Sequence, residues 1–128
     1  MRIPEELGYT KTHEWVRRDE GAVVVGITDY AQGELTDVVF IELPAVGRHV
    51  AAGEELCAVE SVKAVAYVYA PVAGTVAAVN ERLAKEPELL NQDPYGDGWV
   101  ASITPDEPEE AVAFLDAAAY RAHVEAAG

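Results

Sequence analysis

Basic residues are scarce in this sequence. Nine lysines and arginines stand against 23 aspartates and glutamates, which gives a formal net charge of −14. A surface this negative repels phosphate backbones and anionic lipids, so neither nucleic acid nor a membrane is expected as a partner. The charge suits fast, salt-sensitive docking to proteins with basic patches, although it would also serve solubility alone.

Cysteine and long apolar runs are scarce as well. The single cysteine, Cys57, excludes an internal disulfide framework and agrees with a reducing compartment. The longest apolar run, residues 64–73, is interrupted by Pro71 and is far shorter than the roughly 20 residues of a membrane-spanning helix. Residues 1–4 lead into no apolar signal segment, so we expect a cytoplasmic protein.

Apolar residues make up half of the 128 residues, enough for one domain over residues 1–128. They occur in short runs bounded by glycine and proline, which is typical of strands, so a β core is expected over about residues 22–104. A hairpin is predicted from residues 14–18 and 22–27 around a turn that ends in Gly21. The other predicted strands are residues 37–43, 55–60, 64–70, 75–79 and 99–103.

Helical patterns are confined to short segments and to the C-terminal end. Thr28 can cap a short helix through residues 31–35. Near the end of the chain, a cap at Asp106 or Glu107 and apolar residues at helical spacing predict a helix over about residues 107–126. The residues of this pattern are Pro108, Val112, Leu115, Ala119 and Ala122.

Lys63 lies between the predicted strands 55–60 and 64–70, at the tip of a hairpin. Gly53 and Gly74 flank it almost symmetrically, which suits two tight corners closing the hairpin unit. A lysine at such a tip projects its amine away from the sheet, as a tether for a swinging cofactor requires. Most hairpin lysines are ordinary surface residues, but this chain has only three lysines and frames this one with tightly patterned strands.

The remaining polar candidates indicate no catalytic or metal site. Cys57 lies in an apolar strand without a nearby histidine and is expected to be a buried packing residue. His13, His49 and His123 lack the spacing of zinc ligands. Residues 93–99 lack the context of a phosphate-binding motif and are interpreted as a structural turn. No paired acid and base appears, so we expect a carrier and not an enzyme.

The segment around Lys63 resembles the lipoyl-lysine hairpin of the H protein of the glycine cleavage system. Residues 60–64 read Glu-Ser-Val-Lys-Ala, and the similarity extends over residues 56–74. Further blocks follow the order of that family along nearly the whole chain. They are residues 12–16 (THEWV), 26–31 (GITDYA), 37–44 (DVVFIELP), 79–80 (VN) and 93–99 (DPYGDGW).

The resemblance implies a mainly β fold, a flattened β-barrel or two-sheet sandwich of the lipoyl/biotinyl-carrier type with short helices and a C-terminal α-helix. It implies lipoate joined to Lys63 through an amide. Glu60, Ser61, Val62 and Ala64 would then form the context that a lipoate-attaching enzyme recognises. The combined arm of about ten bonds would reach on the order of 12–14 Å.

The implied role is that of a non-catalytic carrier in the glycine cleavage system. In that family a pyridoxal-phosphate glycine decarboxylase loads an aminomethyl group onto the arm. An aminomethyltransferase removes the group, and dihydrolipoamide dehydrogenase reoxidises the arm.

The family also shelters the loaded arm in a cleft near its Ser/Thr-His-Glu-Trp element. Thr12 and Glu14 match that element and could hold the cationic cargo by charge-assisted hydrogen bonds. A solvent-facing strand position is the alternative for Glu14. Tyr67 departs from the family, which usually has aspartate there, and a phenol supplies no negative charge at pH 7.

Three other carriers share parts of this pattern. A biotinyl carrier typically has methionine on both sides of the lysine, where this chain has Val62 and Ala64. A lipoyl domain of a 2-oxoacid dehydrogenase usually has aspartate before the lysine and Ala/Pro-rich linkers, and neither is present. An H-like protein that serves in lipoyl relay stays open. A purely structural β domain would not explain the resemblance along the chain.

Overall fold

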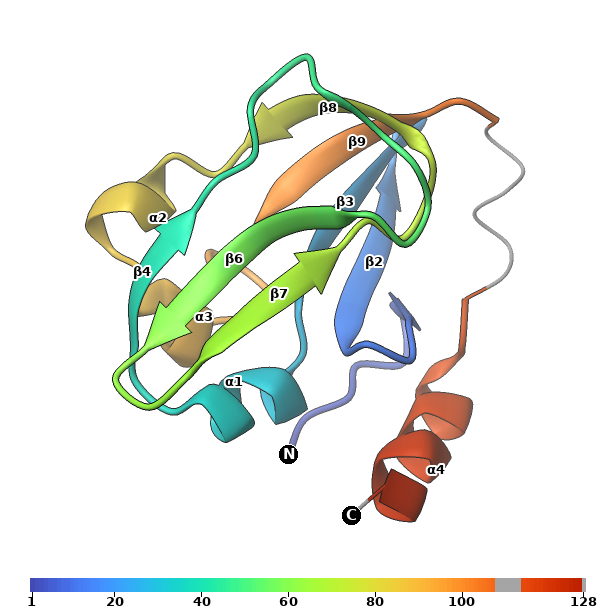
Figure 1. Ribbon diagram of the computed structural model, residues 1–128. Helices are drawn as coiled ribbons and strands as arrows, with labels where there is room; N and C mark the ends of the chain where they lie inside the picture. The colour runs from blue at the N-terminus through green and yellow to red at the C-terminus, as the bar shows by residue number, and fades with distance from the viewer. Residues whose placement is uncertain (108–113, 128) are drawn as a thin grey trace.

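Two antiparallel β-sheets pack face to face in this protein (Figure 1). The computed structural model describes residues 1–107 and 114–127. The larger sheet has six strands in the order β1-β2-β3-β9-β8-β5, and the smaller has three in the order β4-β6-β7. The strands are β1 (Gly8–Tyr9), β2 (Glu14–Asp19), β3 (Ala22–Ile27), β4 (Val38–Glu42), β5 (His49–Val50), β6 (Glu55–Ser61), β7 (Val65–Tyr69), β8 (Gly74–Val79) and β9 (Ala101–Pro105). The predicted two-sheet, mainly β fold is confirmed.

The core lies between the sheets because alternate residues of a strand point to opposite faces of its sheet. On β3, for example, Val23 and Val25 pack into this core, whereas Val24 faces the other side of the large sheet. That outer side holds a second apolar cluster, covered by the N-terminal segment and the C-terminal helix. Its buried members are Ile3, Leu7, Tyr9, Trp15, Val24, Tyr120 and Val124.

The shorter helices lie at the margins of the sheets (Figure 1), whereas the C-terminal helix packs against the outer apolar cluster. The helices are α1 (Asp29–Leu35), α2 (Arg82–Lys85), α3 (Leu89–Gln92) and α4 (Ala117–Ala127). Thr28 caps α1 as predicted, since its hydroxyl accepts a hydrogen bond from the N–H of Ala31 (3.2 Å). None of the helices within the described ranges is long and apolar enough to cross a membrane.

The C-terminal helix begins later than predicted. Leu115 pairs with Tyr9 in an isolated β-bridge, each N–H donating to the other's carbonyl at 2.8 Å. Asp116 then caps α4, because its carboxylate accepts from the N–H of Ala119 (2.8 Å). The predicted helical position of Leu115 is therefore wrong, and α4 begins only at Ala117. The predicted caps, Asp106 or Glu107, directly precede the part of the chain that the structure does not describe. Residues 108–113, with the predicted Pro108 and Val112, lie outside the described residues.

Gly53 and Gly74 do not play the same role, contrary to the symmetric interpretation. Gly53 has φ +84°, so it is a corner of the kind that glycine favours. Gly74 instead begins β8 and pairs with Val50 on one side and Pro105 on the other. A Cβ added there would overlap the carbonyl oxygen of Thr104. Gly74 is therefore required for close approach of two strands and not for a turn.

Gly74→Ala is expected to lower the free energy of unfolding by about 1–3 kcal/mol, the scale of an overpacked core, because β8 and β9 must separate. Gly33→Ala in α1 is the matched control, since a Cβ there meets nothing within 4 Å. Alanine is the better helix former, so that variant should gain up to about 1 kcal/mol. Urea unfolding of both variants measures the difference. Equal stabilities would contradict the proposed close approach at Gly74.

Candidate functional site

The tip of the β6–β7 hairpin carries Lys63, and the Ser61 side chain shapes that tip. The Ser61 hydroxyl accepts hydrogen bonds from the N–H groups of Lys63 (3.2 Å) and Ala64 (3.0 Å), and the Ser61 N–H donates to the Ala64 carbonyl (2.8 Å). The N–H of Val62 donates to the carbonyl of Asp37 (3.0 Å), which follows α1. The Ser61 hydroxyl and backbone contacts therefore hold the tip on both sides without using the lysine side chain.

The Lys63 side chain is exposed, as are its neighbours. Glu60 and Ala64 are exposed, and the side chain of Val62 is 70% exposed. Within the described part of the chain, Lys63 forms no ion pair. The structure thus gathers all the residues predicted as recognition context around one accessible amine.

A cleft of about 280 Å³ begins next to Lys63. Three parts of the chain meet around it: the corner before β2, helix α1, and the β6–β7 hairpin (Figure 1). Its lining residues are Thr12, His13, Glu14, Ile27, Tyr30, Ala31, Glu34, Leu35, Val59 and residues 64–68. Most of these side chains are apolar, so the cleft suits an alkyl chain that enters from the hairpin tip.

Glu14 supplies the buried charge of this cleft and is only 1% exposed. The hydroxyls of Thr10 and Thr12 donate to its Oε1, and the N–H of Tyr69 donates to its Oε2 (3.2 Å). Burial raises the pKa of Glu14 above its ordinary value, while these three donors act in the opposite direction. No lysine, arginine or histidine in the described ranges forms an ion pair with it. The carboxylate is therefore suited to a cation that enters from outside, and the solvent-facing interpretation of Glu14 is wrong.

The same hairpin and cleft belong to a known family. A family profile described as "Glycine cleavage H-protein" matches residues 7–127. The chain belongs to the glycine cleavage H-protein family. Glycine cleavage system H proteins of Anaeromyxobacter sp. (strain K) and Thermus thermophilus are 53% and 52% identical to it, over 98% and 94% of both chains. The crystal structure of a glycine cleavage system H protein from Mycobacterium marinum superposes with a TM-score of 0.87 at 37% identity, covering 96% of this chain and 99% of that one.

This membership confirms the resemblance seen in the sequence, and with it the role of a lipoyl carrier in the glycine cleavage system. The match covers both the hairpin and the cleft, because it spans nearly the whole chain. The family match does not specify the hydrogen bonds and side-chain contacts within the cleft, which depend on the residues of this chain.

Tyr67 lies at the rim of the cleft and not at its buried end. The strand pairing places it opposite Ala58 on the outer face of the small sheet, and its side chain is 47% exposed. The Tyr67 hydroxyl forms no hydrogen bond with any of the described residues. Tyr67 therefore does not supplement the carboxylate of Glu14 in this H protein. The side-chain hydrogen-bond partners of Glu14 are Thr10 and Thr12.

Sequence reasoning missed two of the donors to Glu14, Thr10 and the N–H of Tyr69. For His13, beside Glu14, it favoured a structural role, with a part in shaping the cleft as the alternative. Thr10 donates to Glu14, and its Oγ1 also accepts from the N–H of Glu14 (3.1 Å). The N–H of Tyr69 reaches Glu14 from a strand 55 residues away. His13 lines the cleft in a left-handed backbone conformation, with φ 72°. Of the missed groups, only Thr10 could have been found from the sequence. The pattern Thr-x-Thr-x-Glu over residues 10–14 places two hydroxyl groups within four residues of the carboxylate.

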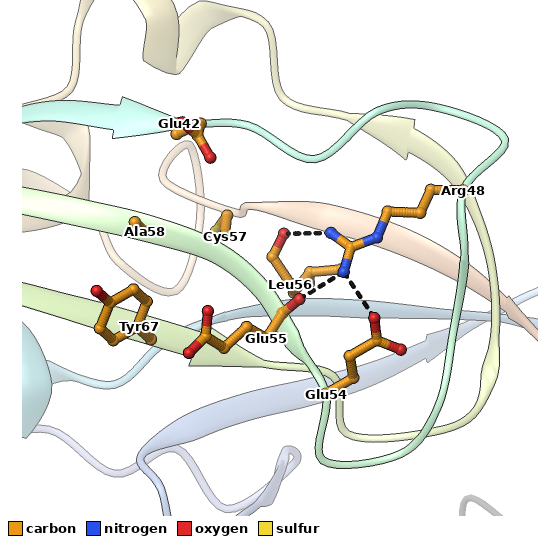
Figure 2. Close-up of a pocket in the computed structure, with 8 residues that line it drawn as sticks. All are labelled: Glu42, Arg48, Glu54, Glu55, Leu56, Cys57, Ala58 and Tyr67. Atoms are coloured by element: carbon orange, nitrogen blue, oxygen red, sulfur yellow. Dashed lines mark hydrogen bonds and ion pairs between the residues drawn. The ribbon is translucent and has the colours of Figure 1, made fainter.

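A second cavity, of about 400 Å³, lies beside the opposite end of β6, where Arg48 crosses the strand (Figure 2). Arg48 donates to the carboxylate of Glu54 (2.9 Å) and to the carbonyls of Glu55 (2.8 Å) and Leu56 (3.3 Å). These bonds brace the start of β6. Cys57 also lines the cavity, but it is buried, and burial raises the pKa of its thiol to about 12. The predicted packing role of Cys57 is confirmed.

Proposed function

We propose that Lys63 is the residue to which lipoate is attached in this H protein. The observation that carries the proposal is the exposed lysine on a hairpin tip held entirely by other groups. An attaching enzyme must reach the amine without unfolding the turn, and the Ser61 hydroxyl and the Asp37 carbonyl keep that turn formed. Val62 and Glu60 are exposed on the same hairpin, where such an enzyme can contact them.

The cleft fits a lipoyl arm on the chemistry of its lining. Its apolar side chains, among them Leu35, Val59 and Val68, would contact the arm's alkyl chain, and Glu14 would face its cargo. When attached, the lipoyl dithiolane supplies the disulfide that accepts an aminomethyl group from one partner and, once reduced, returns electrons to another. The chain's own residues bind, shelter and release that arm.

Glu14 is proposed to hold the cargo by charge. An aminomethyl group is cationic at neutral pH, whereas an arm without cargo is neutral. A carboxylate buried without a cationic partner can bind the loaded, cationic arm better than the neutral arm. Only a group that binds the two states with different affinity can shift the equilibrium between them. Thr12 and Thr10 orient the carboxylate by donating to its Oε1.

The partners proposed for this carrier are the enzymes of the glycine cleavage system. They are a pyridoxal-phosphate glycine decarboxylase, an aminomethyltransferase and dihydrolipoamide dehydrogenase, together with a lipoate-attaching enzyme. Each would act in the cytoplasm on the same arm, and the carrier itself would complete no turnover. The family membership supports this set, because the relatives are named as components of that system.

Association with these partners is expected to slow as salt rises. The net charge of −14 attracts basic surfaces over long range, and salt screens that attraction. Between low and physiological ionic strength we expect the association rate constant to fall roughly tenfold, with little change in the dissociation rate. Stopped-flow or surface-binding kinetics with each partner measures both. Association rates that do not change with salt would show that the negative charge does not steer docking and serves solubility alone.

The proposed attachment is tested by the intact mass of the protein purified from its native cell. Lipoyl, biotinyl and unmodified chains differ unmistakably in mass, and peptide mapping places the added group. A lipoyl group on Lys63 is the expected result. A biotinyl group, or a lipoyl group on another lysine, would overturn the proposal.

A further inference from the structure

Helix α4 reaches the arm cleft through one hydroxyl group, that of Tyr120. Tyr120 is fully buried, and its Oη lies 2.8 Å from both the Nδ1 of His13 and the Oγ1 of Thr28. His13 lines the cleft directly. Thr28 caps α1, and the α1 side chains Tyr30 and Glu34 also line it. A single hydroxyl from the C-terminal helix therefore ties together two walls of the cleft.

The hydrogen bonds around Tyr120 determine where the protons lie. The Thr28 Oγ1 already accepts from the N–H of Ala31, and its hydroxyl has no acceptor other than Tyr120 among the described residues. Thr28 therefore donates to Tyr120, and Tyr120 donates to the Nδ1 of His13. His13 must then be neutral, with its proton on Nε2. A doubly protonated His13 would reverse this chain and leave the Thr28 hydroxyl without an acceptor.

The charges around His13 also favour its neutral form. Burial lowers the pKa of His13, and the nearby ring of His123, 5.7 Å away between centroids, lowers it further, whereas Glu34 of α1 acts in the opposite direction. The ring of Tyr30 packs against that of His13, with 4.7 Å between the centroids. Glu14, whose carboxylate is buried, follows His13 in the chain and begins β2. A cationic His13 would compete with any cation for the charge that this cleft offers.

We propose that Tyr120 is a positioning residue for the loaded arm, whose hydroxyl holds His13 as the neutral Nε2–H tautomer and so keeps Glu14 available to a cationic cargo. The inference rests on the proposed function, because it assigns the cleft a cationic occupant. It makes α4 part of the carrier site, although no residue of α4 lines the cleft. As the pH falls and His13 gains a proton, the chain of hydrogen bonds reverses and the cleft loses its preference for the cation.

The first test needs no arm and no variant. In the unlipoylated protein, ¹⁵N chemical shifts of the histidine rings report which nitrogen of each ring carries the proton. At neutral pH, His13 should have an unprotonated Nδ1 and a protonated Nε2. A protonated Nδ1 at neutral pH would overturn the inference, whatever the state of Lys63.

The second test is Tyr120→Phe, which removes the hydroxyl and keeps the ring that stacks on Tyr9 at 4.7 Å. We expect the Nε2–H form to lose its dominance and His13 to titrate at a higher pH than in the wild type. Tyr95→Phe is the matched control, because the Tyr95 hydroxyl accepts from the N–H of Asp29 at the start of α1 but does not touch His13. Its His13 signals should be those of the wild type. Unchanged His13 signals in Tyr120→Phe would contradict the inference.

The functional readout is the rate at which aminomethyl-loaded protein loses its cargo without a transferase. Water cleaves the carbon–sulfur link, giving thiol, formaldehyde and ammonia. Tyr120→Phe should lose its cargo about two- to tenfold faster than wild type at neutral pH, the scale of one hydrogen bond. If Tyr120→Phe matches wild type while Glu14→Gln is faster, the role of Tyr120 fails and the proposed function stands. Absence of lipoyl from Lys63 in wild-type protein would remove the proposed function instead.

Discussion

The Lys63→Arg protein is expected to fold like the wild type and to carry no lipoyl group. Arginine keeps the positive charge and the exposed position, but it lacks the primary amine that forms the amide. The turn survives because its hydrogen bonds come from Ser61, Ala64 and the backbone of Val62 and not from the lysine side chain. Glycine cleavage reconstituted with this variant should therefore fall to the background without carrier.

Intact mass after incubation with a lipoate-attaching enzyme measures the first part, and glycine-dependent release of carbon dioxide measures the second. Lys11→Arg and Lys85→Arg are the matched controls, since they remove the two other lysines of the chain. Both should be lipoylated as fully as wild type. A lipoyl group on Lys11 or Lys85 in the Lys63→Arg protein would contradict the assignment of the attachment site.

Glu14→Gln is expected to speed the loss of cargo from loaded protein by roughly tenfold to a hundredfold. The amide keeps the shape of the side chain but removes the charge that faces the cationic cargo. The group is only 1% exposed, so solvent screens the interaction little. A hydrogen bond to a charged group is worth about 1.5–3 kcal/mol, which corresponds to this range. Lipoylation of Lys63 should be unchanged, because the hairpin tip does not contact Glu14.

The measurement is the release of ammonia and formaldehyde from loaded protein with no transferase present. Glu34→Gln is the matched control, because Glu34 is an exposed carboxylate that also lines the cleft. Screening by water should keep its effect small. Equal rates for wild type and Glu14→Gln would remove Glu14 from the mechanism, and a larger effect of Glu34→Gln would move the cation site to the mouth of the cleft.

Much of the fold follows from local sequence. Short runs of β-prone apolar residues bounded by turn formers predict β2, β3, β4, β6, β7 and β8, because both signals lie within neighbouring residues. The cap at Thr28 and the corner at Gly53 are local in the same sense. The end of the chain is different, since Leu115 is drawn into a bridge with Tyr9, more than 100 residues away. Helical spacing alone does not show that a distant strand competes for those backbone groups.

The carrier site divides in the same way. The sequence by itself determined the exposed lysine on its hairpin and the family, because both depend on neighbouring residues and on their order. Only the tertiary structure decided that Glu14 is buried with three donors and that Tyr67 lies at the rim. It alone brought Tyr120 to His13, 107 residues apart. Burial, and hydrogen bonds between distant segments, arise only when the sheets and helices pack, and these contacts set the charge that the cleft presents.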